Sequence, residues 1–309
     1  MRIISDDDVL ALTWDEVLGA IRDAFADPKR FVTADRVMLN AAGGGAYLTM
    51  PCADAEGWFG VKQVSVLPGN PARGLPSVQA WYTLFDPAGR PAMGGPATLL
   101  TRLRTAATSA IAAEALAPRT PRSLLVVGTG SLAPWMAQAH LQVRAYETVW
   151  VWGRRREQAE RVVAEVLRTF EGHASRPAVE VTDDLEGTAR AADVISVATT
   201  ASVPIVRGAW LHAGQHVDLV GAFVRDMREV DAEAVKRSMV IVDDRAAARE
   251  EAGDLHYAAR EGWSWSDVAA DLHEVVRSGA RERPKDRPTL FKSVGLAFED
   301  LVVARLLAG

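Results

Sequence analysis

The sequence predicts an α/β protein in which a doubly wound parallel sheet is joined to a second unit of mixed α+β structure. From Ser123 onward, short continuous apolar runs alternate with helical stretches, which is typical of parallel strands that are buried on both faces. A glycine-rich turn follows the first of these runs. Before Ser123 the apolar residues alternate instead, as in antiparallel strands with one exposed face. The 309 residues are enough for two ordinary domains.

The composition is that of a soluble globular protein. Hydrophobic residues make up 49% and charged residues 24% of the chain, with a net charge of −5. We therefore expect no general attraction to nucleic acid or to anionic membranes. The acidic start, "MRIISDDDVLAL", argues against a signal peptide, and no apolar run approaches the roughly 20 residues of a membrane helix. The only cysteine, Cys52, excludes an internal disulfide framework and predicts a cytoplasmic protein.

The first part of the chain contains helical signals, then strands, then a long helix. Thr13 and Glu16 form a capping box ahead of "VLGAIRDAFA". The segments "WFGVKQVSV" and "VQAWYTLFD" predict two antiparallel strands. A helix is expected from about Thr98 to the residues before Pro118.

The second part predicts the parallel sheet. The expected strands are "SLLVVG", "TVWVWG", "DVISVAT", "HVDLVGA" and "MVIVDD". The tail "TLFKSVGLAFEDLVVARLLA" predicts an amphipathic helix without a strand partner, which returns to the first domain. We expect a dinucleotide-binding domain over residues 118–285. Residues 1–117 and 286–309 then form a substrate-binding and dimerisation domain.

The stretch "VVGTGSLAPWMAQAH" predicts the strand-to-helix turn of a Rossmann-type site. Gly128 allows the tight turn, and Gly130 leaves room for a pyrophosphate. Ala133 stands where a third glycine is usual, and alanine is a common substitute there. Pro134 falls in the first helical turn, where its missing N–H costs little. The motif therefore predicts dinucleotide binding.

The end of the second strand predicts which dinucleotide binds. An NAD site usually carries an acid about 20 residues after the turn. Here "VWVWGRRREQ" places Gly153 at that position, followed by Arg154, Arg155 and Arg156. Arginine suits a 2′-phosphate, so NADP(H) is favoured over NAD(H). The alternative is a solvated basic helix start, although cations are slightly unfavourable at a helix N-terminus.

Two basic residues of the first domain lie in apolar surroundings. Lys62 shares its strand face with Gly60, Val64 and Val66. A lysine in an apolar cleft can have a pKa lowered into the range useful for proton transfer, although periodicity alone favours an exposed lysine on an edge strand. Arg104 lies in a helix rich in small residues. Its guanidinium needs an anion, either a substrate carboxylate or the partner of a buried ion pair.

No metal site is expected. His212 and His216 are four residues apart, but Gly214 lies between them and the segment enters a strand. Cys52 is interpreted as a packing residue.

These residues lie within a wider pattern that resembles the ornithine cyclodeaminase / mu-crystallin family over essentially the whole chain. The matching stretches are "GVKQVSVLPGNPARGLPSVQA", "LLTRLRTAATSA", "VVGTGSLAPWMAQAH", "VDLVGAFVRDMREVD", "VDDRAAAREEAGDL" and "FKSVGLAFEDL". The resemblance implies a homodimer and a substrate held between the two domains. It also implies that Arg36, Lys62 and Arg104 hold the substrate. The residues that it places at the cofactor or beside it are Ser77, Ser131, Leu132, Thr199, Val220, Ser293 and Val294, and we assign Val294 to the substrate.

One departure decides among the activities of this family. Ornithine cyclodeaminases are expected to carry a catalytic aspartate two residues after the glycine of the strand "HVDLVGA", and here that residue is Phe223. A phenyl ring cannot transfer a proton. "GAFVRDMRE" resembles instead the branch of Δ1-pyrroline-2-carboxylate reductases and related ketimine reductases.

The hypothesis is therefore reduction of a cyclic imino acid such as Δ1-pyrroline-2-carboxylate to L-proline. Arg104, helped by Arg36, grips the carboxylate, Lys62 holds or supplies the proton for the imine nitrogen, and Phe223 adds an apolar wall. Three alternatives stay open: ornithine cyclodeamination to proline and ammonia, a non-catalytic NADPH-binding protein like mu-crystallin, and another amino-acid or opine-type dehydrogenase.

Overall fold

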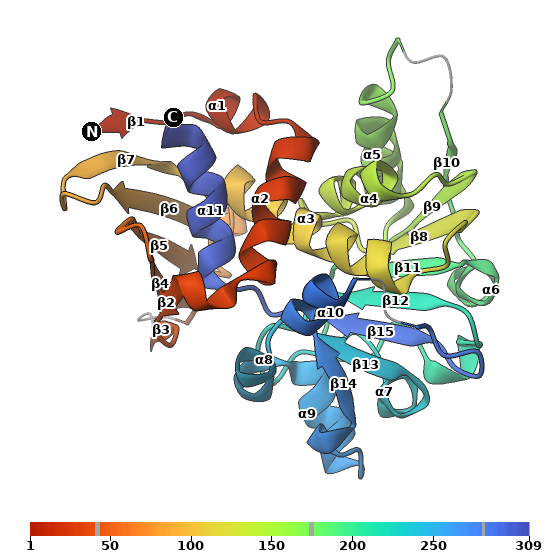
Figure 1. Cartoon of the computed structure of the whole chain (residues 1–309). Helices are drawn as coiled ribbons and strands as arrows, with labels where there is room; N and C mark the ends of the chain where they lie inside the picture. Colours follow the sequence, from red (N-terminus) through yellow and green to blue (C-terminus); the bar gives the residue numbers. More distant parts are fainter. Residues whose placement is uncertain (41–43, 173–175, 280–281, 309) are drawn as a thin grey trace. The chain divides into compact units, whose positions relative to one another are not determined.

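The computed structural model describes residues 1–40, 44–172, 176–279 and 282–308, which form two compact units (Figure 1). Unit 1 contains residues 1–105 and 296–309, and unit 2 contains residues 106–295. The boundaries expected from sequence were 117/118 and 285/286. The first boundary falls instead inside a helix, and the second follows a strand of the parallel sheet. No helix among the described residues is both long and apolar enough to cross a membrane.

Unit 1 is built on a seven-stranded sheet. Its strands are β1 (Arg2–Ile3), β2 (Phe31–Thr33), β3 (Val37–Asn40), β4 (Ala46–Asp54), β5 (Phe59–Val66), β6 (Val78–Phe85) and β7 (Pro91–Pro96). Its helices are α1 (Asp6–Leu10), α2 (Trp14–Ala26), α11 (Ala297–Ala308) and the first part of α3 (Thr98–Leu116). The predicted capping box of Thr13 and Glu16 begins α2 and is confirmed.

The centre of this sheet is an antiparallel meander in the order β7-β6-β5-β4. The two antiparallel strands expected from sequence are β5 and β6, and both are confirmed. Alternate residues of β4, such as Leu48, Met50 and Cys52, are buried because α2 and α11 contact each other and α11 packs on β4, β5 and β6. The opposite face is exposed and carries apolar side chains, including those of Leu39 and Trp81.

Unit 2 is built on an eight-stranded parallel sheet in the order β10-β9-β8-β11-β12-β15-β13-β14. Its strands are β8 (Ser123–Val127), β9 (Thr148–Trp152), β10 (Ala178–Val181), β11 (Val194–Val197), β12 (His216–Leu219), β13 (Met239–Val242), β14 (Val268–Asp271) and β15 (Thr289–Lys292). Its helices are the rest of α3, α4 (Ala133–Val143), α5 (Arg156–Arg168), α6 (Leu185–Ala191), α7 (Ala232–Arg237), α8 (Arg245–Glu251), α9 (Gly253–Arg260) and α10 (Leu272–Ser278). Short 3-10 turns complete the chain at Pro28–Arg30, Asn70–Arg73, Gly208–Trp210 and Trp265–Asp267.

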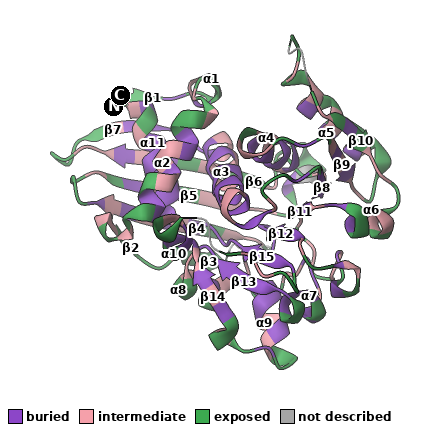
Figure 2. Ribbon diagram, turned by 45° about the vertical axis from the view of Figure 1, so that its right-hand side comes forward, coloured by how far each residue is buried: buried purple, intermediate pink, exposed green. Residues whose placement is uncertain are grey.

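This sheet is buried on both faces, as its apolar runs predict (Figure 2). Along β8, Leu124 and Val126 belong to the core cluster that includes residues of α4 and α5. Leu125 and Val127 belong to the other cluster, on the opposite face, with residues of α7 and α9. The prediction of a doubly wound parallel sheet is therefore confirmed, and all five strands expected from sequence are present.

The prediction that the tail is one helix is wrong. Its first residues, Thr289–Lys292, form β15, which is fully buried between β12 and β13. Only Ala297–Ala308 are helical, as α11 of unit 1. The run "TLFK" is too short for its periodicity to separate a buried strand from a helix, and pairing with two neighbouring strands decides the outcome.

Candidate functional site: a buried charge cluster and a dinucleotide-binding edge

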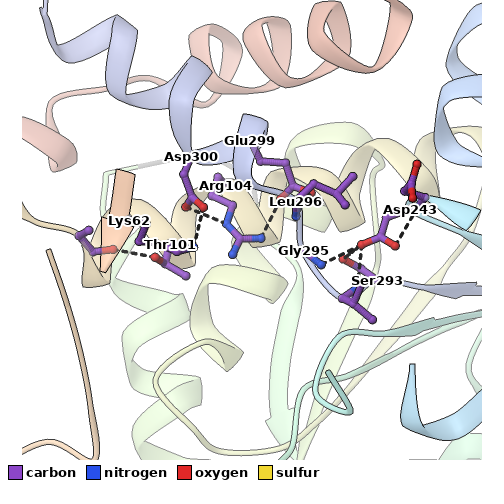
Figure 3. A network of polar contacts seen from close by, with 12 residues as sticks. Lys62, Thr101, Arg104, Asp243, Ser293, Gly295, Leu296, Glu299 and Asp300 are labelled. Carbon is purple, nitrogen blue, oxygen red and sulfur yellow. Dashed lines mark hydrogen bonds and ion pairs between the residues drawn. The ribbon is translucent and has the colours of Figure 1, made fainter. Parts of the chain in front are cut away.

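Lys62, Arg104, Glu299 and Asp300 form a buried charge cluster in unit 1 (Figure 3). The Lys62 ammonium donates to Asp300 Oδ2 at 2.5 Å. Arg104 Nε donates to the other oxygen of Asp300 at 3.2 Å, and its Nη1 donates to Glu299 Oε2 at 2.7 Å. The carboxylate of Asp300 therefore bridges the two cations.

Strand order explains why Lys62 is buried. β5 lies between β4 and β6, where Lys62 stands opposite Met50 and Tyr82. All three side chains are buried, on the face against which α11 packs. Periodicity alone had favoured an exposed lysine on an edge strand. That prediction is wrong, because β5 is an interior strand.

The cluster changes the acidity of Lys62. Burial lowers the pKa of this lysine to about 8, against the attraction of Asp300, and the nearby charges of Arg104 and Arg36 lower it further. A lysine with this pKa can hold a proton at neutral pH and also release it.

The sequence left two anions open for Arg104, a substrate carboxylate and the partner of a buried ion pair. The structure shows that Arg104 has buried ion pairs. Glu299 and Asp300 raise the pKa of its guanidinium, although burial opposes them. Sequence reasoning did not single out these two acids, since "FEDL" reads as the polar face of an amphipathic helix. The signal was their position in the first turn of an otherwise largely apolar helix, and both side chains are fully buried.

The other predicted residues of unit 1 lie in its loops. Arg36 is half-buried between β2 and β3, and its charge acts on Lys62. Ser77 lies directly before β6, and its carbonyl accepts the N–H of Leu67.

In unit 2 the glycine-rich turn has the geometry that dinucleotide binding requires. Gly128 follows β8 with a φ of +126°, and a Cβ there would lie 2.4 Å from the carbonyl oxygen of Ala198. A Cβ on Gly130 would meet nothing within 4 Å, so this residue faces open space. Ser131 is exposed and Leu132 precedes α4, which begins at Ala133 without a side-chain cap. The N–H of Ala133 donates to the carbonyl of Gly130 and Pro134 has none, so the turn ahead of this helix, at Ser131 and Leu132, is the part suited to phosphate oxygens.

The end of β9 has no place for an acid. A Cβ on Gly153 would lie 2.3 Å from Cγ2 of Thr129, and the Thr129 hydroxyl donates to Gln158. Arg154 and Arg155 are exposed and make no ion pair among the described residues, whereas Arg156 pairs with Glu160 and Asp183. The first two arginines therefore have guanidinium groups available to a ligand.

Other predicted residues lie where parallel strands end. Thr199 follows β11, Val220 follows β12, and Ser293 and Val294 follow β15. The sheet order reverses between β8 and β11. Ligands of doubly wound sheets bind at the carboxyl ends of the strands, at such a switch point.

Buried carboxylates fix two groups of these loops, and sequence reasoning missed both. Asp243 accepts from the Ser293 hydroxyl at 3.0 Å and from the backbone N–H groups of Val294 and Gly295 at 2.6 and 2.8 Å (Figure 3). Glu229 accepts from the N–H groups of Thr199 and Gly221. Asp243 directly follows a buried strand, which was the available signal for it, whereas Glu229 lies in the long loop between β12 and α7, where no local pattern marks it.

Phe223 lies in the loop after β12, half-buried against the hydrophobic core of unit 2. The neighbouring acids do not replace an aspartate there. Asp226 is exposed, and Asp218 is fully buried, where it accepts hydrogen bonds from the hydroxyls of Ser109 and Ser196.

Among the described residues, no group of three or more His, Cys, Asp or Glu side chains is arranged to hold a metal ion. His212 is exposed, and its ring lies within hydrogen-bond distance of backbone carbonyls. His216 is buried in β12 beside Thr289.

The fold and these two sets of residues define a dinucleotide-binding α/β protein with a second unit that holds a buried lysine. The model of the ornithine cyclodeaminase/mu-crystallin family matches residues 5–308, and the chain belongs to this family.

Named relatives span nearly the whole chain. A Δ1-pyrroline-2-carboxylate reductase of Paracoccus denitrificans is 35% identical, over 96% of this chain and 92% of its own. The structure of a Thermococcus litoralis Δ1-pyrroline-2-carboxylate reductase in complex with NADH and L-proline superposes with a TM-score of 0.93 at 30% identity, covering 100% of this chain and 96% of its own. An archaeal alanine dehydrogenase dimer with bound NAD has a TM-score of 0.90 at 28% identity, covering 100% and 95%.

Replacing Glu299 with glutamine tests the energetics of the charge cluster. The change leaves the Arg104 guanidinium buried with one fewer counter-charge, and breaking a buried ion pair costs about 3–5 kcal/mol. We expect a loss of this order in the free energy of unfolding, measured with urea. The control is Glu56→Gln, whose exposed ion pairs with Arg30 and Arg305 should matter far less. Equal losses in the two variants would contradict the interpretation.

Proposed function

We propose that this protein reduces a cyclic imino acid, such as Δ1-pyrroline-2-carboxylate, to the corresponding amino acid with a nicotinamide dinucleotide. The observation that carries the proposal is the buried Lys62 ammonium, whose pKa is lowered to about 8, in a chain that also has a glycine turn suited to a dinucleotide. The reductases of Paracoccus denitrificans and Thermococcus litoralis, one of them in complex with NADH and L-proline, support the same assignment.

In the proposed mechanism Arg104 and Arg36 hold the substrate carboxylate through charge-assisted hydrogen bonds, and Arg104 does so while it stays paired with Glu299 and Asp300. Lys62 supplies a proton to the imine nitrogen, which makes the C=N carbon more electrophilic. When bound, the cofactor supplies the hydride that this carbon accepts. Asp300 keeps the Lys62 ammonium in one place and favours its charged form. Phe223 and Val294 provide apolar surface beside the nicotinamide.

The direct test is oxidation of NADPH and of NADH with five- and six-membered cyclic imino acids, beside ornithine with NAD⁺. Oxidation with an imino acid is expected. Ammonia release from ornithine alone would identify a cyclodeaminase, which the phenyl ring of Phe223 disfavours because it cannot transfer a proton. Cofactor binding without turnover of any imino acid would identify a non-catalytic binding protein.

We further propose that NADP(H) is preferred to NAD(H). Arg154 and Arg155 are exposed at the end of β9, where the ribose 2′ position is recognised in this fold. Thr129 occupies the space that a side chain at Gly153 would need, which disfavours the acid of an NAD site.

We propose that the protein is a homodimer whose interface is the exposed face of the unit 1 sheet. On this face Val32 is 74%, Leu39 63%, Tyr47 49% and Trp81 41% exposed, and register places these side chains on the side of the sheet opposite Lys62. Apolar patches of this kind mark protein interfaces, and the alanine dehydrogenase is described as a dimer.

We assign the protein to the cytoplasm. The chain has one cysteine, and burial raises the pKa of the Cys52 thiol to about 12, which suits a packing role. Cell fractionation tests this assignment, and recovery from a secreted fraction would contradict it.

The pH dependence of turnover tests the role of Lys62. If its protonated form is the active one, turnover falls as the pH rises through about 8. Asp300→Asn removes the group that most favours the charged form, so the fall should move to lower pH by roughly one unit. Glu299→Gln is the matched control, because it leaves the carboxylate that pairs with Lys62. An unchanged profile in Asp300→Asn would exclude Lys62 as the proton donor.

Cofactor preference is tested by replacing arginines at the end of β9. Arg154→Ala/Arg155→Ala should raise the KM for NADPH about tenfold or more, the effect of losing charge-assisted contacts to a phosphate, with little change for NADH. Arg156→Ala is the control, since Arg156 already pairs with Glu160 and Asp183. Equal effects on NADPH and NADH would contradict the proposed specificity.

The dimer interface is tested by Leu39→Glu. A carboxylate in an apolar interface should shift the protein toward monomer in analytical ultracentrifugation, since burying an unpaired charge is costly. Val203→Glu, at an apolar residue of unit 2 that is 69% exposed, should leave the distribution unchanged. A dimer that survives the Leu39 substitution would place the interface elsewhere.

A further inference from the structure

Unit 2 contains a second buried ionic group, the triad Glu229, Asp254 and Lys292, which the mechanism above does not use. All three side chains are at most 1% exposed. The Lys292 ammonium lies 3.2 Å from Asp254 Oδ2. The other oxygen of Asp254 accepts the backbone N–H groups of Glu229 and Val230 at 2.6 and 3.1 Å, so Asp254 holds the segment that carries Glu229.

The carboxylate of Glu229 is directed at two loops. One oxygen accepts from the N–H of Thr199 at 2.6 Å and from its hydroxyl at 3.0 Å. The other accepts from the N–H of Gly221 at 2.7 Å. Thr199 follows β11 and Gly221 follows β12, so one side chain joins the carboxyl ends of two adjacent parallel strands.

The two loops are packed around this carboxylate with no spare room. A Cβ on Gly221 would lie 1.9 Å from the carbonyl oxygen of Thr199 and 2.4 Å from Glu229 Oε1. Burial raises the pKa of Glu229, whereas Lys292 and the backbone N–H donors favour the charged form, and N–H donors on both oxygens fit a carboxylate. Burying an ionic group costs free energy. Backbone N–H groups from both loops offset part of that cost by donating to the Glu229 carboxylate.

The position of these loops points to their use. β11 is next to β8 at the switch point of the sheet, and β12 is the following strand. In a doubly wound fold one half of a dinucleotide meets the glycine turn after the first strand and the end of the second strand. The other half then meets the loops after the strands across the switch point, which here include Thr199 and Gly221.

We infer that Glu229 is a positioning residue for the nicotinamide half of the cofactor, which acts through the backbone of Thr199 and Gly221 without touching the cofactor. The inference rests on the proposed function only in taking the ligand to be a nicotinamide dinucleotide. Asp254 and Lys292 support Glu229 by fixing its backbone and balancing its charge.

The variant Glu229→Gln tests whether Glu229 positions the two loops for the cofactor or only stabilises the fold. Both carboxylate oxygens accept N–H donors, so the amide NH₂ of glutamine must face the N–H of Thr199 or of Gly221, and one loop moves. NADPH binding, followed by fluorescence, should weaken about tenfold, the effect of losing one charge-assisted hydrogen bond, and kcat should fall. Binding of 2′,5′-ADP, the adenine half alone, should stay as in the wild type. The same comparison can be made with NADH as the whole cofactor and ADP as its adenine half.

The controls keep the test decisive. Asp231→Asn changes a carboxylate that caps α7 and accepts the N–H groups of Gly208 and Ala234, so its effects report loop stability alone. Glu229→Asp keeps the charge balance with Lys292 but shortens the side chain, so that it cannot reach both loops, and it serves if Glu229→Gln does not fold. Equal weakening of NADPH and 2′,5′-ADP, or wild-type binding and kcat, would overturn the inference. Failure of the wild type to oxidise NADPH with any imino acid would overturn the proposed function instead, because the binding comparison needs no substrate.

Discussion

The ion pairs of Asp300 are the interaction on which the candidate site of unit 1 depends. This carboxylate accepts from both Lys62 and Arg104, two cations whose burial in an apolar interior would otherwise be costly. Burial of Lys62 by itself would favour a neutral amine, and Asp300 offsets part of that effect. The balance leaves a lysine that can carry a proton near neutral pH and still transfer it, which is what a proton donor to an imine requires.

Unit 2 uses the same principle at another place. Buried carboxylates of Glu229 and Asp243 accept backbone N–H groups from loops that follow β11, β12 and β15. Loops at the ends of parallel strands have few ladder hydrogen bonds of their own, so a charged acceptor from a neighbouring segment fixes them more firmly than a neutral one would. These acids therefore tie together loops at the carboxyl edge of the sheet through their backbone N–H groups.

In the proposed assignment, Phe223 and its surroundings separate this chain from the cyclodeaminases of the family. Phe223 lies where a cyclodeaminase is expected to have a proton-transferring aspartate, and neither Asp218 nor Asp226 takes its place. With proton transfer assigned to Lys62 in unit 1, reduction of an imine needs no second acid at Phe223. This division of tasks is consistent with relatives that are named reductases.

The sequence by itself determined the fold class and the glycine turn, because these depend on local periodicity and on backbone geometry. Residue type and apolar neighbours also marked Lys62 and Arg104 as candidate cations, although periodicity alone favoured an exposed lysine. The sequence did not determine β15, whose four residues become a strand only through pairing with β12 and β13. It also did not reveal Glu299 and Asp300 as partners of the cations, nor Glu229 as the acceptor for two loops. These contacts join residues up to 238 positions apart, so only the tertiary structure, which decides which side chains share a buried space, could show them.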